Sequence, residues 1–232
     1  MTVPSVNELN ARRGVVIGDI HGCHRAFRVL IENLDLKSDD FVVVLGDAVD
    51  RGPNSRDVLD QMIRLRQKCE LIYILGNHEE MMLSALKGRD VERWLRHGGA
   101  ETLGAYDGDL KNIPSEHIQL LKSTVRYWEG PTEICVHANL EPGVPLERQR
   151  SAWLRWNKLT GQEFPHSSGK RVICGHSGVN YGAPTVNDGW ICLATLVYEG
   201  GVLSAIDLAS LEIIQTRQKN AEIRRGVYLW EL

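Results

Sequence analysis

The chain has 232 residues, of which 43% are apolar and 25% are charged, and its formal net charge is -3 at pH 7. This composition is typical of a folded globular protein and excludes a disordered polyelectrolyte or a collagen-like fibre. The nearly balanced charge contains no long run of one sign, so we expect neither a nucleic-acid partner nor a membrane-surface partner. Five cysteines without a C-x-x-C pair and the lack of a membrane-length apolar run predict a cytoplasmic protein.

The first 75 residues alternate short apolar runs with amphipathic stretches. The runs at 15–17, 41–45 and 71–75 are continuous and apolar, which predicts strands that are buried on both faces. The stretches at 25–34 and 55–68 carry apolar residues at helical spacing and predict helices. This alternation predicts an α/β fold in which crossover helices join parallel strands.

The middle of the chain has helical patterns at 81–87 and 91–97 and two further predicted strands at 133–136 and 171–174. Residues 86–131 lie between two polar motifs and contain none themselves. We therefore expect a helical segment there that determines substrate specificity.

The last third of the chain, from Ile191 onward, alternates β-like runs with turn residues. Runs at 202–208, 213–216 and 227–232 predict a second, largely antiparallel sheet. Because no linker or internal repeat divides the chain, residues 1–232 are expected to form a single domain.

Five of the predicted strands end in polar motifs. Because the carboxyl ends of parallel strands meet at one edge of a sheet, we expect these motifs to converge in one crevice. Carboxylate, amide and imidazole groups suit Mn²⁺, Fe or Zn²⁺ better than Cu(I), and six of them are enough for two divalent ions. The candidate ligands are Asp19, His21, Asp47, Asn77, His137 and His176.

Each candidate also has a structural interpretation when it is taken alone. A single histidine such as His137 or His176 is more often a hydrogen-bonded structural residue than a metal ligand. Asp47 could cap a helix, and Asn77 could occupy a turn. The conjunction favours the metal site, because the six specified positions of the motif at 46–52 match by chance only about once in 10⁷ windows.

The motifs in their order resemble the signature of the phosphoprotein phosphatase family of binuclear metallophosphoesterases. The resemblance covers about residues 15–208 and is to the small bacterial and bacteriophage-type serine/threonine protein phosphatases. It implies an α/β, calcineurin-like metallophosphoesterase fold, with a two-sheet β-sandwich core flanked by α-helices. The motifs are GDIHG at 18–22, GDAVDRG at 46–52, GNHE at 76–79, VHAN at 136–139 and CGHS at 174–177.

The resemblance also implies a role for each candidate ligand. Two divalent ions are expected per chain, with Mn²⁺ as the expected metal and Fe or Zn²⁺ as alternatives. By position, one ion would be held by Asp19 and His21, Asp47 would bridge, and the other ion would be held by Asn77, His137 and His176.

The same positions predict a mechanism. A hydroxide bridging the two ions would attack phosphorus directly, and His78, paired with Asp50, would protonate the leaving group. Arg51 and Asn77 are expected to contact the phosphate, and the resemblance implies a second phosphate-binding arginine in a Trp-x-Arg context, which Arg155 matches. The alternatives are that His78 only orients a ligand and that Arg51 forms a surface ion pair.

The leading functional prediction is a serine/threonine phosphoprotein phosphatase that acts on a phosphorylated protein or peptide, and Asp50 favours it because it serves a leaving-group acid. The alternative is a dinucleoside polyphosphate hydrolase, for example of diadenosine tetraphosphate. A third reading is a catalytically inactive binding module, which the complete set of ligand types disfavours. The chain departs from the family at Asn139, where Gly is usual, and at 194–196, where Ala-Thr-Leu replaces Asp-Thr-Gly.

Overall fold

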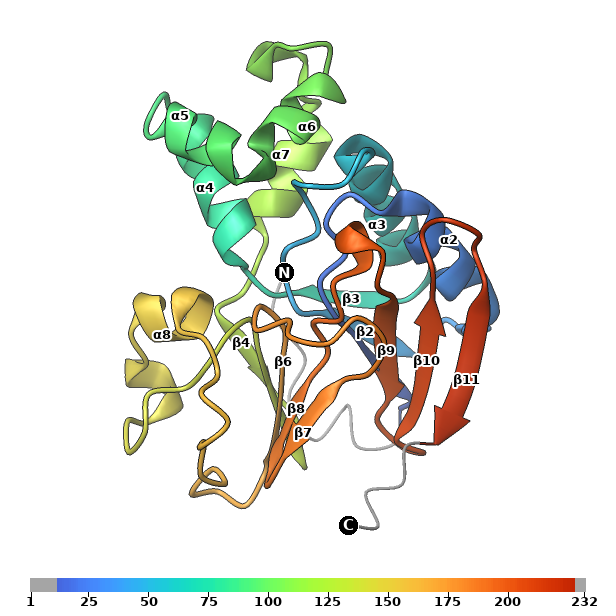
Figure 1. Ribbon diagram of the computed structural model, residues 1–232, viewed down its shortest axis with the longest axis vertical. Coiled ribbons are helices and arrows are strands. Elements are labelled where there is room, and N and C mark those ends of the chain that lie inside the picture. The colour runs from blue at the N-terminus through green and yellow to red at the C-terminus, as the bar shows by residue number, and fades with distance from the viewer. Residues whose placement is uncertain (1–11, 228–232) are drawn as a thin grey trace.

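The computed structural model describes residues 12–227 as two β-sheets packed face to face, with helices on the outside (Figure 1). The layer between the sheets is apolar and includes Val16 and Val43 from one sheet and Cys135 and Ile173 from the other. The predicted α/β fold and its two-sheet core are therefore confirmed.

The first sheet has six strands in the order β11-β10-β9-β1-β2-β3. The three strands β1, β2 and β3 run parallel, and β9, β10 and β11 are antiparallel to their neighbours. The bounds are β1 (Gly14–Ile17), β2 (Phe41–Val44), β3 (Glu70–Tyr73), β9 (Leu203–Asp207), β10 (Glu212–Thr216) and β11 (Ile223–Val227).

The prediction that the C-terminal strands form a separate sheet is wrong. β9 pairs antiparallel with β1, with Val16 opposite Ile206, so the last three strands extend the first sheet. The physical reason is burial: every residue of β9 is buried, and such a strand belongs in the interior of a sheet rather than on a one-sided hairpin. Of the strand predicted at 227–232, only Val227 lies within the described residues.

The second sheet has the order β4-β5-β6-β8-β7 and comes from the middle of the chain. Its strands β5, β6 and β8 are parallel, while β4 and β7 pair antiparallel at the edges. The bounds are β4 (Tyr127–Glu129), β5 (Glu133–Val136), β6 (Arg171–Cys174), β7 (Thr185–Asn187) and β8 (Trp190–Cys192).

Helices cover the outer faces of both sheets. Figure 1 shows α4 to α7, in green, standing above the sheets, and α8, in yellow, beside the second sheet. The helices are α2 (His24–Asn33), α3 (Ser55–Lys68), α4 (Asn77–Ala85), α5 (Val91–Trp94), α6 (Ala100–Gly104), α7 (Ser115–Lys122) and α8 (Ser151–Trp156), with short helical turns η1 (Leu95–Gly99), η2 (Leu110–Asn112), η3 (Leu146–Arg148) and η4 (Val197–Glu199).

Two helical predictions need a correction of their bounds. The helix expected at 81–87 begins at Asn77, because the Glu79 carboxylate accepts a hydrogen bond from the Gly76 N–H at 3.0 Å and so closes the first turn. The helical segment expected at 86–131 is helical only as far as Lys122, and its last residues form β4. No helix within residues 12–227 is long and apolar enough to cross a membrane.

Candidate active site

The six predicted ligands come together where β1, β2, β3, β5 and β6 end. Asp47 lies at the centre: its Oδ2 is 3.6 Å from Nε2 of His21, and its Oδ1 is 3.4 Å from Nε2 of His137. Asn77 Oδ1 lies 2.9 Å from His137 Nε2 and 3.0 Å from His176 Nδ1. The expected convergence of the strand ends is therefore observed, but it is not at the edge of one sheet as predicted, because β1, β2 and β3 belong to the first sheet and β5 and β6 to the second.

Each of the three histidines among the predicted ligands has one ring nitrogen within hydrogen-bond distance of a backbone carbonyl. His21 Nδ1 lies 3.1 Å from the Val49 oxygen, and His137 Nδ1 lies 2.8 Å from the Leu45 oxygen. His176 uses Nε2 instead, at 3.1 Å from the Trp156 oxygen. A carbonyl only accepts, so each of these nitrogens carries the proton in the neutral ring. The other nitrogen then presents a lone pair toward the centre, as metal-ligating histidines do.

Two groups of side chains share Asp47 and could each hold a metal ion. One is His21, Asp47 and His78, and the other is Asp47, His137 and His176; within each group the ligand atoms lie within 4.8 Å of one another. Burial disfavours the Asp47 carboxylate, but the positive charges that His137, His78, His21 and His176 carry when protonated outweigh burial and hold the pKa of Asp47 well below its usual value, so it stays ionised. The geometry therefore offers two candidate metal sites that share one carboxylate.

An unpaired buried atom also fits a cation at this place. Oδ1 of Asp19 is buried without a hydrogen-bond partner among the described residues. Burial, together with the Asp47 charge, raises the pKa of Asp19 well above its usual value, which a nearby cation would offset. The structure groups His78, rather than Asp19, with His21 and Asp47, so the pairing of Asp19 with His21 stays a prediction.

The loops that carry these residues have an uncommon backbone conformation. His21, Asp47, Asp50, Arg51 and His176 all have positive φ, between 45° and 70°. For residues other than glycine such a conformation costs about 1–3 kcal/mol each, and it persists only where surrounding contacts impose it. Its concentration at the strand ends marks this place as a functional site.

A buried glutamate supplies some of those contacts. The Glu79 carboxylate accepts hydrogen bonds from the backbone N–H groups of Asp47 at 2.7 Å and of Ala48 at 2.8 Å. Burial, followed by the charge of Asp47, raises the pKa of Glu79 to about 7. Glu79 therefore ties the start of α4 to the loop after β2 and orients the central carboxylate.

The predicted acid, His78, forms a buried pair with Asp50. Its Nδ1 lies 2.8 Å from Asp50 Oδ2, and both side chains are fully buried. Burial lowers the pKa of His78, but the carboxylates of Asp47 and Asp50 outweigh it and raise the value above that of a free histidine. A ring held in this way keeps its proton near neutral pH, as a leaving-group acid must.

Side chains of the helical segment above the sheets donate hydrogen bonds to Asp50, the carboxylate of this pair. The indole N–H of Trp94 donates to both oxygens of Asp50, at 3.1 and 3.0 Å, and Thr102 Oγ1 donates to Oδ1 at 2.8 Å. The backbone N–H of Arg51 donates to the Gly98 carbonyl at 3.0 Å. Sequence reasoning missed Trp94 and Thr102, because they belong to no motif and no spacing relates them to Asp50.

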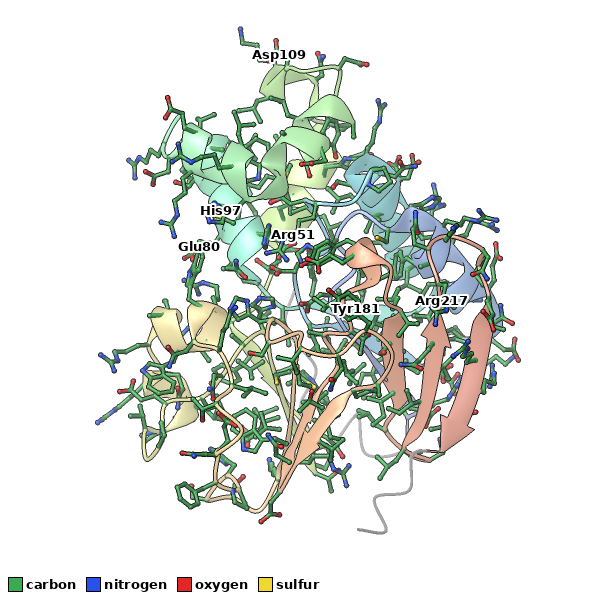
Figure 2. The ribbon with its side chains drawn as sticks, in the orientation of Figure 1. Arg51, Glu80, His97, Asp109, Tyr181 and Arg217 are labelled. Carbon is green, nitrogen blue, oxygen red and sulfur yellow. The ribbon has the colours of Figure 1, made fainter. Side chains whose placement is uncertain are left out.

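A polar cavity of about 290 Å³ opens over the centre. Arg51 enters it, donates to the Tyr198 hydroxyl and lies 4.7 Å from the centroid of that ring. In Figure 2, Arg51 lies between the helices that carry Glu80 and His97 and the loop that carries Tyr181. The cavity is lined by Asp19, His21, Asp47, Arg51, Lys158, His176, Gly178, Ala194, Leu196, Val197, Tyr198 and Glu199.

The second predicted phosphate ligand, Arg155, does not line this cavity. It is 7% exposed and donates to Glu80 at 2.5 Å. Lys158, which belongs to none of the motifs, is the second cation in the cavity wall. Its ammonium forms no ion pair with a described residue. The role of Arg155 at the phosphate stays a prediction, whereas Lys158 is a candidate that the sequence did not reveal.

The sequence at 194–196, where the chain departs from the Asp-Thr-Gly of the resemblance, leads into a tight turn at the edge of the cavity. Leu196, which stands at the glycine position, has φ 54° and ψ 44°, and it borders the cavity. Thr195 Oγ1 donates to the Val202 carbonyl at 2.6 Å and braces the turn. The left-handed leucine costs about 1–2 kcal/mol, so the turn is imposed by the surrounding contacts.

Residues 13–193 match the sequence model of the calcineurin-like phosphoesterase family. An asymmetrical bis(5'-nucleosyl)-tetraphosphatase, PrpE of Geobacillus thermodenitrificans, is 32% identical over 82% of this chain and 88% of the relative. Serine/threonine-protein phosphatase 2 of Salmonella typhimurium is 35% identical over 76% of this chain and 84% of the relative.

Among solved structures, a provisionally named diadenosine tetraphosphatase has a TM-score of 0.71 and 23% identity, and the match covers 91% of this chain and 96% of that one. The likeness over nearly the whole of both chains agrees with the two-sheet fold described above.

Proposed function

The chain belongs to the calcineurin-like phosphoesterase family, and from this premise we propose that it is a metal-dependent hydrolase that cleaves a dinucleoside tetraphosphate asymmetrically. The observation that carries the proposal is the likeness to an asymmetrical bis(5'-nucleosyl)-tetraphosphatase, which extends over 82% of this chain. It supports the dinucleotide reading more than the phosphoprotein reading that the motifs favour, because it spans more of both chains than the likeness to the serine/threonine phosphatase.

The residues of the site suit this reaction. Two bound divalent ions would supply water activation and neutralise phosphate charge; His21, Asp47, Asn77, His137 and His176 are proposed to hold them together with Asp19, and Mn²⁺ is the proposed metal.

Arg51 and Lys158 face the cavity and would bind the oxygens of the phosphate chain. Hydrolysis adds a water oxygen to phosphorus and breaks one bridging P–O bond, so that diadenosine tetraphosphate gives ATP and AMP. Asp50 holds Nδ1 of the His78 ring at 2.8 Å, and Nε2 of this ring, 3.9 Å from Asp47 Oδ2, would donate a proton to the departing oxygen.

The test is a comparison of substrates with one enzyme preparation in Mn²⁺. Initial rates are measured on diadenosine tetraphosphate, a phosphoserine peptide and p-nitrophenyl phosphate, and nucleotide products are separated by anion-exchange chromatography. We expect ATP and AMP in equal amounts and a kcat/KM for the dinucleotide well above that for the peptide. Two molecules of ADP, or a higher kcat/KM for the peptide, would overturn the proposal.

A phosphoprotein phosphatase is the second candidate. The buried pair of His78 and Asp50 favours it, because an alkoxide leaving group needs an acid more than a nucleotide leaving group does. The 35% identity with a serine/threonine-protein phosphatase supports the same reading. The peptide arm of the comparison above decides between the two.

The role of His78 is tested by His78→Asn. We expect the variant to retain metal and to lose rate mainly on phenyl phosphate, whose leaving group is poor, rather than on p-nitrophenyl phosphate. Equal losses on both esters would mean that His78 orients ligands instead of donating the proton.

A further inference from the structure

A second cavity adjoins the metal centre and has a different chemistry. It has a volume of about 580 Å³, within the range of small-ligand pockets, and is lined by α8 and the loops on either side of that helix. We call it the α8 groove. Its apolar wall consists mainly of Leu140, Pro145, Trp153, Phe164, Pro165 and Trp190.

One residue connects this groove to the metal centre. Lys158 lines both this groove and the polar cavity over the metal centre. The Lys158 ammonium has no ion-pair partner among the described residues, so an anion that passes from one cavity to the other would meet a free cation.

Contacts within the chain hold the groove open. The Trp190 indole N–H donates to the Phe164 carbonyl at 3.0 Å, which fixes the backbone of the outer wall. The Leu159 N–H donates to Ser177 Oγ at 2.8 Å, and the Glu163 carboxylate accepts from the Gly161 N–H at 3.0 Å. The groove is therefore built before a ligand arrives, which reduces the entropic cost of binding.

The ring of Phe164 is the feature that points to an occupant. It is 84% exposed although it stands in an apolar wall, so it offers a free face for stacking. Amide and hydroxyl groups at the rim, on Asn157, Thr160, Gln162 and Ser167, can bind the polar edge of a base or a sugar. An aromatic face, a polar rim and a cation toward the metal centre match a nucleoside with phosphates attached.

We propose that the α8 groove is the subsite for one nucleoside of the substrate, with the base against Phe164 and the phosphate chain passing Lys158 to the metal centre. The inference rests on the proposed function, since only a nucleotide substrate needs such a subsite. A third cavity, lined by Tyr198, Lys219 and Arg224, also lies next to the centre. It lacks an apolar wall comparable to that of the α8 groove and is the competing location for the nucleoside.

The experiment compares Phe164→Ala with Lys219→Ala, a matched exposed variant in the competing cavity. Because base stacking on an aromatic ring is removed, we expect Phe164→Ala to lower kcat/KM for diadenosine tetraphosphate by about tenfold, mainly through KM. The rate on p-nitrophenyl phosphate, which has no nucleoside, should stay the same, and Lys219→Ala should behave like the wild type on both substrates.

Binding of AMP, measured by titration calorimetry in the wild type and both variants, separates the two proposals. If the wild type fails to cleave the dinucleotide but binds AMP more tightly than Phe164→Ala does, the proposed function is wrong and the nucleoside subsite is supported. The subsite is refuted if Phe164→Ala binds AMP as the wild type does, if Lys219→Ala is the variant that loses affinity, or if only phosphopeptide turnover depends on Phe164.

Discussion

Replacing Trp94 by Phe should damage the acid of the site without touching any predicted metal ligand. The side chain of Asp50 is fully buried and accepts hydrogen bonds from the Trp94 indole, from Thr102 and from His78. A hydrogen bond to a charged group is worth about 1.5–3 kcal/mol. Its removal should therefore lower the free energy of unfolding by about that amount and the Tm by about 3–12 °C.

The kinetic effect follows from the chemistry of the leaving group. With one donor fewer, the Asp50 carboxylate is less stabilised and holds the His78 imidazolium less well. We expect Trp94→Phe to lower kcat on phenyl phosphate at least about threefold more than on p-nitrophenyl phosphate, a small part of the roughly 10²–10⁴ that a general acid contributes. Thermal denaturation and initial rates on the two esters measure both effects.

The chain offers a matched control in Trp128. This side chain is also buried, at 3% exposed, but its indole nitrogen has no hydrogen-bond partner within the described residues. Trp128→Phe removes the same atoms and so leaves a similar packing defect, but it breaks no hydrogen bond; it should therefore lower the free energy of unfolding by less than Trp94→Phe does, and its leaving-group dependence should stay that of the wild type. Equal effects of the two substitutions would refute the role assigned to Trp94.

Three further outcomes are expected. Asp47→Asn should leave the purified protein with neither metal ion at full occupancy, because both candidate groups use this carboxylate; unchanged metal content by elemental analysis would exclude the bridging role. Gly98→Ala should destabilise the fold by more than about 1 kcal/mol, because Gly98 has φ 99° and an added Cβ would lie 2.6 Å from the backbone nitrogen of Arg51. Gly104→Ala is the control, because an added Cβ there would meet open space, and denaturant unfolding compares the two variants. Burial opposes ionisation of Asp207, but the hydrogen bonds that this carboxylate accepts from Arg13 and from two backbone N–H groups outweigh burial and lower the pKa of Asp207. The ionised carboxylate therefore stabilises the fold fully above the unfolded pKa of about 3.9, and this stabilisation is lost as the pH falls through the folded pKa. The Tm of the wild type should therefore fall more steeply below pH 4 than that of Asp207→Asn, and parallel curves would contradict this contribution.

The sequence alone was sufficient for the first half of the fold and for the location of the centre. Continuous apolar runs such as 41–45 can only be buried on both faces, and parallel strands joined by helices bring their carboxyl ends to one edge. The loops after β1 and β2 therefore meet, and the His21 N–H donates a hydrogen bond to the Asp47 carbonyl at 2.8 Å. Local periodicity and the order of the elements determine that meeting, whereas the contact of Asp47 with His137, which follows β5 of the second sheet, depends on how the two sheets pack.

Only the tertiary structure decided which residues outside the motifs serve the site. Trp94 reaches Asp50 because helix packing folds the segment at 86–131 back over the loop after β2, and no local pattern encodes that packing. The pairing of β9 with β1, rather than with a separate sheet, likewise depended on which strand edge remained free. Arg155 donates to Glu80 and does not line the cavity, whereas Lys158 lines it together with Arg51, and neither position follows from a motif. Such choices depend on contacts between segments distant in sequence, whereas the strand-end motifs depend on residues that are neighbours in the chain.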